Sequence, residues 1–245
     1  MVGLHGIQSH GGWYVESCQQ LARAGYSVSF LDRRGSGVNE RDRGDAPSFR
    51  RLLDDVAEFL TTLPRPCFLM AISWGGKLAV AMQRRHPNSC DGVILIAPGF
   101  CPRVRPGFVE RLRIIAARLI SRWRTFPIPL NDPELFTANN ERQQFIRDDS
   151  LMLRRATARM MFESGRLDVY LRLAARSVTV PVLLLLAGDD RIIDNAGTRQ
   201  FIERFGTNDR TVIEYAGAHH TLEFEPGGPP FVDDVLKWLQ SRSGR

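Results

Sequence analysis

Residues 67–79, CFLMAISWGGKLA, are the most informative stretch of the chain, because an apolar segment of strand length gives way to a helical pattern at a single serine, Ser73. A sharp turn between a strand and a helix forces such a serine into a strained backbone conformation with neighbouring segments close by. The positions two before and two after it therefore tolerate little beyond glycine or alanine. Here they are Ala71 and Gly75, a looser match than two glycines, and this stretch alone is equally compatible with a plain buried serine.

Two later apolar stretches also end in residues that can titrate. Val180–Gly188 is followed by Asp189–Asp190, and Thr211–Tyr215 is followed, after three small residues, by His219–His220. In open α/β sheets the carboxyl ends of the strands are where sites are built. The chain order Ser, Asp, His is the order that α/β-hydrolases use, and it differs from the order in other serine hydrolases.

Strand and helix patterns alternate from the start of the chain to about Pro98 and again from Val180 to the end. This alternation predicts a mostly parallel sheet with helices on both faces, formed by residues 1–98 and 180–245. The predicted strands are Val2–Leu4, Ser27–Asp32, Cys67–Ser73, Gly92–Ala97, Val180–Gly188 and Thr211–Tyr215. Amphipathic spacing predicts the helices Phe49–Leu63, Trp74–His86 and Pro230–Leu239.

The interval between these two halves, residues 99–179, has helical patterns and no good strand. Helices are predicted over residues 104–123, 148–162 and 167–175. Prolines should break the interval into hinged pieces, and they stand at Pro102, Pro106, Pro127, Pro129 and Pro133. An all-helical insertion between two halves of a parallel sheet is typical of a cap, or lid, over the site.

A serine hydroxyl is a poor nucleophile at neutral pH, so a base must accept its proton and a third group must orient that base. His220 and Asp190 have the required chemistry. His219 competes for the role of the base, and either histidine also fits a surface position. Asp189 and Asp194 compete for the role of the acid, although Asp189 fits a turn and Asp194 fits the N-cap of a helix that begins at the next residue.

The reaction also needs an oxyanion hole, which consists of two backbone N–H groups aimed at the developing negative charge. One is expected from Trp74, directly after the serine, and the other from the loop after the strand that contains Leu4. That loop, residues 5–14 with the sequence HGIQSHGGWY, resembles the His-Gly loop of the serine aminopeptidase and monoacylglycerol lipase group of α/β-hydrolases. In that family the residue after His-Gly donates the second N–H, which implies Ile7.

The resemblance covers nearly the whole chain and implies the α/β-hydrolase fold. Residues 32–37, DRRGSG, resemble the family's D-x-R-G-x-G turn. In residues 188–194, GDDRIID, the family's acid falls on Asp190, and in residues 217–222, GAHHTL, its histidine falls on His220. The resemblance therefore implies a catalytic triad of Ser73, His220 and Asp190, and it implies no cofactor and no metal.

Two features depart from the family pattern. Ala71 replaces the first glycine of the serine turn, which removes no catalytic group. The family also has two strands before the His-Gly loop, whereas four residues precede His5 here. The amino-terminal strands are therefore expected to be missing, which would leave Ser27–Asp32 as an exposed edge of the sheet.

The net charge of the chain is +6, and its basic excess lies in residues 99–179, which hold 15 arginines against 8 acidic residues. A nucleic-acid surface more often carries lysines with interleaved aromatics, and the chain has only Lys77 and Lys237, so no nucleic-acid partner is expected. Within Val104–Trp123, arginines alternate with apolar side chains. This pattern fits either a helix that contacts a membrane surface or an ordinary cap helix.

No apolar run reaches the roughly 20 residues that a membrane span needs, and the first ten residues do not resemble a signal peptide, so a cytoplasmic protein is expected. The cysteines lack metal-ligand spacing and are expected to be reduced; they are Cys18, Cys67, Cys90 and Cys101. The predicted function is hydrolysis of a lipid-like carboxylic ester of the monoacylglycerol or lysophospholipid type. The alternatives are amide cleavage, as in the aminopeptidases of the family, and a non-catalytic relative that binds a ligand.

Overall fold

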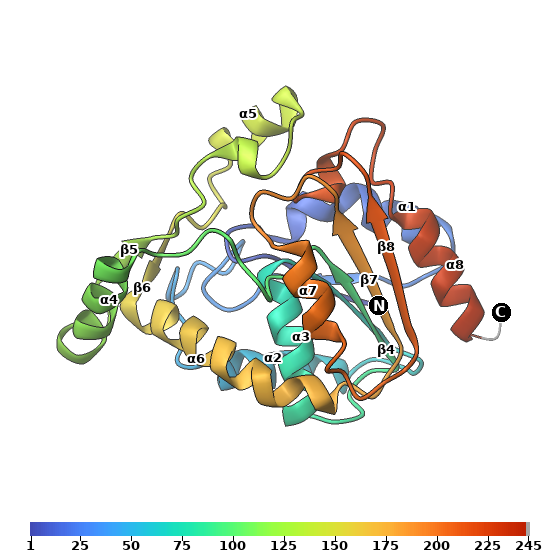
Figure 1. Ribbon diagram of the computed structural model, residues 1–245, viewed down its shortest axis with the longest axis horizontal. Coiled ribbons are helices and arrows are strands. Elements are labelled where there is room, and N and C mark those ends of the chain that lie inside the picture. Colours follow the sequence, from blue (N-terminus) through green and yellow to red (C-terminus); the bar gives the residue numbers. More distant parts are fainter. Residues whose placement is uncertain (244–245) are drawn as a thin grey trace.

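A six-stranded parallel β-sheet lies at the centre of the protein, with the strand order β2-β1-β3-β4-β7-β8 (Figure 1). The computed structural model describes residues 1–243. The strands are β1 (Val2–Leu4), β2 (Ser29–Leu31), β3 (Phe68–Ile72), β4 (Gly92–Ile96), β7 (Val182–Ala187) and β8 (Arg210–Tyr215). All six lie where the sequence predicts them, and their ends differ from the prediction by at most two residues.

The helices cover both faces of this sheet, as predicted. They are α1 (Val15–Arg23), α2 (Phe49–Leu60), α3 (Trp74–Arg85), α7 (Asn195–Ile202) and α8 (Val232–Ser243). Helices α1 and α8 pack together on one face, and α2, α3 and α7 lie on the other (Figure 1). The central strands β3, β4 and β7 are buried over their whole length, and this is why they are continuous apolar runs.

Strand β2 is one edge of the sheet, as the sequence predicts. Within residues 1–243 it pairs only with β1, and Ser29 to Leu31 are each half-buried. The opposite edge is β8, whose side chains alternate between half-buried and exposed over most of its length.

The insert, residues 99–179, joins β4 to β7 and extends to one side of the sheet in Figure 1. It contains α4 (Phe108–Ile120), β5 (Thr125–Pro127), α5 (Asn140–Asp148), β6 (Arg155–Thr157) and α6 (Ala158–Ala174). Short 3-10 turns occupy Pro133–Leu135 and Ala175–Ser177.

The expectation that this insert is all-helical is wrong, because β5 and β6 form a two-stranded antiparallel sheet. Each strand has three residues, which is too short for an alternating pattern to stand out. Phe126 is the buried residue of β5, and it packs with Ile114 and Ala117 of α4. A tertiary contact therefore holds this strand in place.

The predicted helix over residues 148–162 is also wrong at its start, because α5 ends at Asp148, a turn and loop follow, and Arg155–Thr157 form β6. The Thr157 hydroxyl accepts a hydrogen bond from the Met160 N–H and caps α6, which begins at Ala158. The helix predicted over residues 167–175 is the second half of the same α6.

Among residues 1–243, no helix is both long enough and apolar enough to span a bilayer. All four cysteines have free thiols, as expected.

Candidate active site

Ser73 lies at the junction of β3 and α3 in a left-handed backbone conformation, with φ 51° and ψ −119°. The turn is held from both sides, because the Ser73 N–H donates to the carbonyl of Ile96 at 2.9 Å and its own carbonyl accepts from Gly99 at 2.7 Å. A Cβ atom at Gly75 would lie 2.4 Å from the Leu4 carbonyl oxygen, so glycine is required there. Ala71 is fully buried in β3, and the turn forms with alanine at that position.

His220 connects Ser73 to Asp190 through two hydrogen bonds. Its Nε2 lies 3.0 Å from the Ser73 Oγ, and its Nδ1 lies 2.8 Å from the Asp190 Oδ2. The other carboxylate oxygen, Oδ1, accepts from the N–H groups of Ile192 at 2.8 Å and Ile193 at 2.9 Å. A carboxylate only accepts, so His220 Nδ1 carries the proton and the Nε2 lone pair faces the serine hydroxyl.

The competing residues lie elsewhere. The Asp194 side chain caps α7 by accepting from the Ala196 N–H at 3.2 Å. Asp189 is exposed, and its N–H donates to the carbonyl of Ala218. His219 contacts Glu225, with 3.5 Å between Nδ1 and the carboxylate. The structure therefore brings Ser73, Asp190 and His220 together. Of the alternatives, Asp189 lies in a turn, Asp194 caps α7, and the partly buried His219 contacts Glu225.

The loop of residues 5–14, which we call the His-Gly loop, approaches Ser73 closely. A Cβ atom at Gly6 would lie 3.4 Å from the Ser73 Cβ, so the glycine leaves room for this approach. Arg33 donates from one guanidinium nitrogen to the Gly6 carbonyl at 2.6 Å and from the other to the Ile7 carbonyl. In a trans peptide the C=O and N–H groups point in opposite directions, so the Ile7 N–H points away from Arg33.

The amides of Ile7 and Trp74 lie beside the serine. Both residues line the same cavity as Ser73. Among residues 1–243, neither N–H donates a hydrogen bond to another group of the protein. Trp74 is also the first residue of α3, where the helix leaves its N–H groups unpaired and favours negative charge. The arrangement therefore presents two free donors and the positive end of a helix at one place.

Arg33 also connects the two candidate donors. Its guanidinium carbon lies 5.1 Å from the centroid of the Trp74 ring. The same guanidinium group donates to the Ile7 carbonyl, so Arg33 contacts both residues that supply the candidate N–H donors. Burial lowers the pKa of Arg33 to about 9, so the group stays charged at neutral pH.

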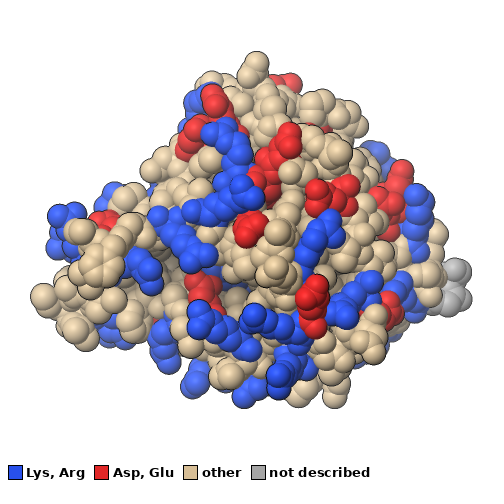
Figure 2. All heavy atoms as spheres, in the orientation of Figure 1, with Lys and Arg blue, Asp and Glu red and all other residues tan. Residues whose placement is uncertain are grey.

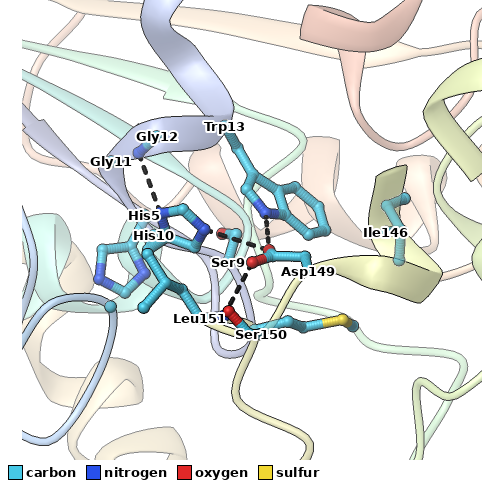
Figure 3. A network of polar contacts seen from close by, with 12 residues as sticks. His5, Ser9, His10, Gly11, Gly12, Trp13, Ile146, Asp149, Ser150 and Leu151 are labelled. Carbon is cyan, nitrogen blue, oxygen red and sulfur yellow. Dashed lines mark hydrogen bonds and ion pairs between the residues drawn. The ribbon is translucent and has the colours of Figure 1, made fainter. Parts of the chain in front are cut away.

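A second polar network fastens the His-Gly loop to the insert (Figure 3). The His10 Nδ1 accepts from the Gly12 N–H at 3.1 Å, so its Nε2 carries the proton and donates to the Asp149 Oδ2 at 3.1 Å. The Trp13 indole N–H donates to the same oxygen at 2.7 Å. Burial acts to raise the pKa of Asp149, but the hydrogen bonds from His10 and Trp13 outweigh it and the pKa is lowered. Asp149 thus remains an anion that ties the two segments together.

A cavity of about 710 Å³ opens at Ser73 between the sheet core and the insert. Helices α4 and α6 of the insert and α7 of the core supply much of its wall. Its apolar lining includes Phe100, Ile114, Ile128, Met161, Phe162 and Phe201. Within the described residues, no group of three or more His, Cys, Asp or Glu side chains is placed to hold a metal ion.

The sequence analysis did not predict the roles of three residues that hold this site together. They are Arg33, His10 and Asp149. Arg33 lies within the family-like DRRGSG turn, but its contact with the His-Gly loop crosses 26 or 27 positions of the chain. The His10–Asp149 contact crosses 139 positions. No spacing rule covers such separations.

Comparison with known proteins identifies the family. The model of the serine aminopeptidase, S33, family matches residues 1–227, and the chain belongs to this family. Monoglyceride lipase of Rattus norvegicus is 28% identical over 254 residues, which cover 97% of this chain and 81% of that protein. Lysophospholipase L2 of Escherichia coli (strain K12) is 27% identical over 244 residues, which cover 86% of this chain and 71% of that protein.

Solved structures agree with this assignment. The crystal structure of Paleococcus ferrophilus monoacylglycerol lipase superposes with a TM-score of 0.89 at 25% identity, covering 98% of this chain and 93% of that one. The predicted family, the α/β-hydrolase fold and the class of serine hydrolases are confirmed.

Proposed function

We propose that this protein hydrolyses a lipid-like carboxylic ester, of the monoacylglycerol or lysophospholipid type. In this proposal Ser73 is the nucleophile, His220 the general base and Asp190 the group that orients the base, while the N–H groups of Ile7 and Trp74 form the oxyanion hole. The observation that carries the proposal is the hydrogen-bonded row from the Ser73 Oγ through His220 to Asp190, located at a strained turn and open to a cavity.

The geometry supports a two-step acyl transfer. The Ser73 Oγ attacks the ester carbonyl carbon, its proton passes to the His220 Nε2, and the carbonyl electron pair moves to the oxygen. Collapse of this tetrahedral intermediate breaks the bond to the alcohol oxygen, which leaves with the proton from Nε2. Water then attacks the acyl-enzyme in the same way and gives up a proton to His220, which returns it to Ser73 as the carboxylic acid departs.

Each supporting group acts where charge develops. Asp190, fixed by two backbone N–H groups, holds His220 in the one tautomer that can accept a proton from Ser73 and stabilises the imidazolium that forms. The Ile7 and Trp74 N–H groups are free to receive the oxyanion, and they need no reorganisation because Arg33 and the start of α3 fix their peptides.

The cavity supports a substrate with an apolar chain. Its volume of about 710 Å³ and its largely apolar lining suit an acyl chain or a lipid alcohol. The names of the relatives, monoglyceride lipase and lysophospholipase, favour an ester over an amide. We assign the core to residues 1–98 and 180–245 and propose that the insert, residues 99–179, acts as a cap over this cavity.

We also propose that α4 of the cap contacts an anionic membrane surface. Its exposed apolar side chains include Phe108 (74% exposed), Leu119 (83%) and Ile120 (86%). Helix α4 also carries Arg111, Arg113 and Arg118, and Figure 2 shows blue basic atoms beside tan ones at the end of the molecule where Figure 1 places α4. An apolar helix face flanked by cations fits the boundary between lipid tails and anionic headgroups.

A fluorophosphonate probe tests the catalytic assignment. The purified protein should bind the probe covalently and should hydrolyse p-nitrophenyl butyrate, and Ser73→Ala should lose both properties while keeping the fold. Ser121→Ala, at an exposed serine of the insert, is the matched control and should retain both. Turnover by Ser73→Ala above half that of the parent would overturn the assignment. Faster cleavage of an aminoacyl p-nitroanilide than of any ester would instead support the amide-cleaving alternative.

A further inference from the structure

The cavity at Ser73 is strongly cationic as well as apolar. Its charged lining residues are Lys77, Arg105, Arg111, Arg166, Arg172 and Arg204, against the single acid Asp168. Arg166 pairs with Glu163, and Lys77 pairs with Asp168. Within residues 1–243, the other four arginines form no ion pair. The cavity therefore carries a surplus of positive charge that the protein does not neutralise.

Lys77 is the most deeply placed of these cations. It lies one helical turn after Ser73 on α3, and its side chain is only 6% exposed. A Cβ atom at Gly99 would lie 3.3 Å from the Lys77 Cε and 3.3 Å from the Ser73 carbonyl oxygen, so the lysine stem runs beside the serine turn. Its Nζ donates to the Asp168 Oδ1 at 2.5 Å, and Asp168 is itself 48% exposed.

The Lys77 ammonium has more donors than its surroundings use. An ammonium group carries three N–H donors, and within the described residues Nζ donates to one protein oxygen. Burying a charge is costly unless it is paired and hydrogen-bonded, and a half-exposed carboxylate satisfies this need only in part. The free donors belong to a side chain that lines the cavity, where a ligand oxygen would complete them.

Two arginines from other segments of the chain line the same cavity as Lys77. The charges of Arg105, Arg204 and Lys77 all act on the Cys101 thiol, where they oppose the rise in its pKa that burial causes. Cys101 and the three cations line the same cavity as Ser73, and the cations come from three separate segments of the chain. A cavity lined by charges of one sign attracts ligands of the opposite sign.

We propose that Lys77, Arg105 and Arg204 form a subsite for an anionic group of the substrate, either a phosphate or a carboxylate. This inference rests on the proposed ester hydrolysis and narrows its substrate class to an amphiphilic ester that carries an anion, in preference to a neutral monoacylglycerol. Apolar atoms of the ligand contact the lining near Phe100 and Phe201, and the anion displaces or shares the contact between Lys77 and Asp168.

A binding experiment in the Ser73→Ala protein tests the subsite without requiring turnover. Calorimetric titration with n-octyl phosphate should show binding, with n-octyl glucoside as the neutral comparison. Lys77→Gln and Arg204→Gln should each weaken octyl phosphate binding by about tenfold or more, the effect of losing a charge-assisted contact. Asp168→Asn should strengthen it, because this carboxylate competes with the ligand for Lys77. Arg176→Gln, at an exposed arginine beyond the cavity, is the matched control and should leave binding unchanged.

Lys77→Gln should weaken octyl phosphate binding and Asp168→Asn should strengthen it, so the two variants distinguish an anion subsite from a purely structural ion pair. If the Lys77–Asp168 ion pair only stabilises the fold, the two variants lower the unfolding midpoint similarly and neither alters the affinity for octyl phosphate. That result would overturn the proposal, as would equal affinity for octyl phosphate and octyl glucoside in the Ser73→Ala protein.

Kinetics of the unmodified protein then locate the anion on the substrate. A preference for lysophosphatidate over monoacylglycerol of the same chain length places the anion on the alcohol side. A preference for mono(4-nitrophenyl) glutarate over p-nitrophenyl butyrate places it on the acyl side. Binding of octyl phosphate without turnover of any ester would contradict the proposed function and support the anion subsite. Ester turnover without octyl phosphate binding would support the proposed function and overturn the anion subsite.

Discussion

Replacing Arg33 should slow catalysis although this residue does not touch the substrate. Two of its guanidinium nitrogens donate to the carbonyls of Gly6 and Ile7, and this contact fixes the peptide that carries the Ile7 N–H. In Arg33→Met both carbonyls lose a charged donor, and the Gly6–Ile7 peptide becomes free to rotate. The N–H would then spend part of its time turned away from the oxyanion.

The structure sets the size of this effect. Loss of one oxyanion-hole donor costs about 10²–10³ in kcat. Arg33→Met misorients the Ile7 donor without removing it, and the Trp74 donor stays in place at the start of α3. We therefore expect kcat to fall by about 10- to 100-fold, with KM changed much less, because the lost interaction forms only in the transition state. Two charge-assisted hydrogen bonds of about 1.5–3 kcal/mol each are also removed, so the protein should be less stable.

The assay is hydrolysis of p-nitrophenyl butyrate, followed together with urea unfolding so that only folded protein is compared. Arg33→Lys keeps the charge but cannot bridge two carbonyls as a planar guanidinium does, so its kcat should fall between those of the parent and Arg33→Met. Arg34→Met is the matched control, because Arg34 binds Asp55 outside the site and should affect kcat little. A folded Arg33→Met protein with kcat within twofold of the parent would show that Arg33 does not position the Ile7 N–H.

Three further predictions concern other parts of the molecule. Asp190→Asn should lower kcat by about 10⁴-fold through the wrong histidine tautomer, whereas Asp189→Asn should stay near the parent rate; the reverse result would show that the acid has been misassigned. Burial raises the pKa of Glu223 from 4.5 to about 7, so the unfolded chain loses this proton at a lower pH than the folded protein and stability falls as the pH rises from 4.5 to 7. Glu223→Gln should therefore raise the free energy of unfolding at pH 8 relative to the parent by about 3 kcal/mol and have little effect at pH 4, and an equal effect at both values in urea unfolding would count against it. Replacing both Leu119 and Ile120 by serine should reduce co-sedimentation with anionic liposomes, as should high salt, and unchanged recovery in the pellet would remove α4 from the membrane contact.

Short-range patterns were enough to predict the sheet and the serine turn. The composition of each strand reflects whether it is buried or lies at an edge of the sheet. The continuous apolar run VLLLLA, for example, predicts a strand that is buried on both faces. The Ser73 turn is equally local, since small residues on both sides are a steric requirement of the turn itself. The chain order of Ser73, Asp190 and His220, together with the resemblance to the family, singled out the residues that the fold brings within hydrogen-bonding distance.

The residue types at the carboxyl edge of the sheet can be predicted from the sequence, whereas the contacts that hold them and the side chains that surround them depend on the three-dimensional fold. Strands β5 and β6 exist because Phe126 packs against α4, and no three-residue pattern reveals that contact. The hydrogen bonds from Arg33 to the His-Gly loop likewise join segments that are distant in the sequence. The physical reason is the same in both cases: a local pattern records whether a side chain is buried, whereas the partner it meets depends on the path of the whole chain. The charges of Lys77 and Arg204 can be read from the sequence, but only the fold places both side chains in the wall of the cavity at Ser73.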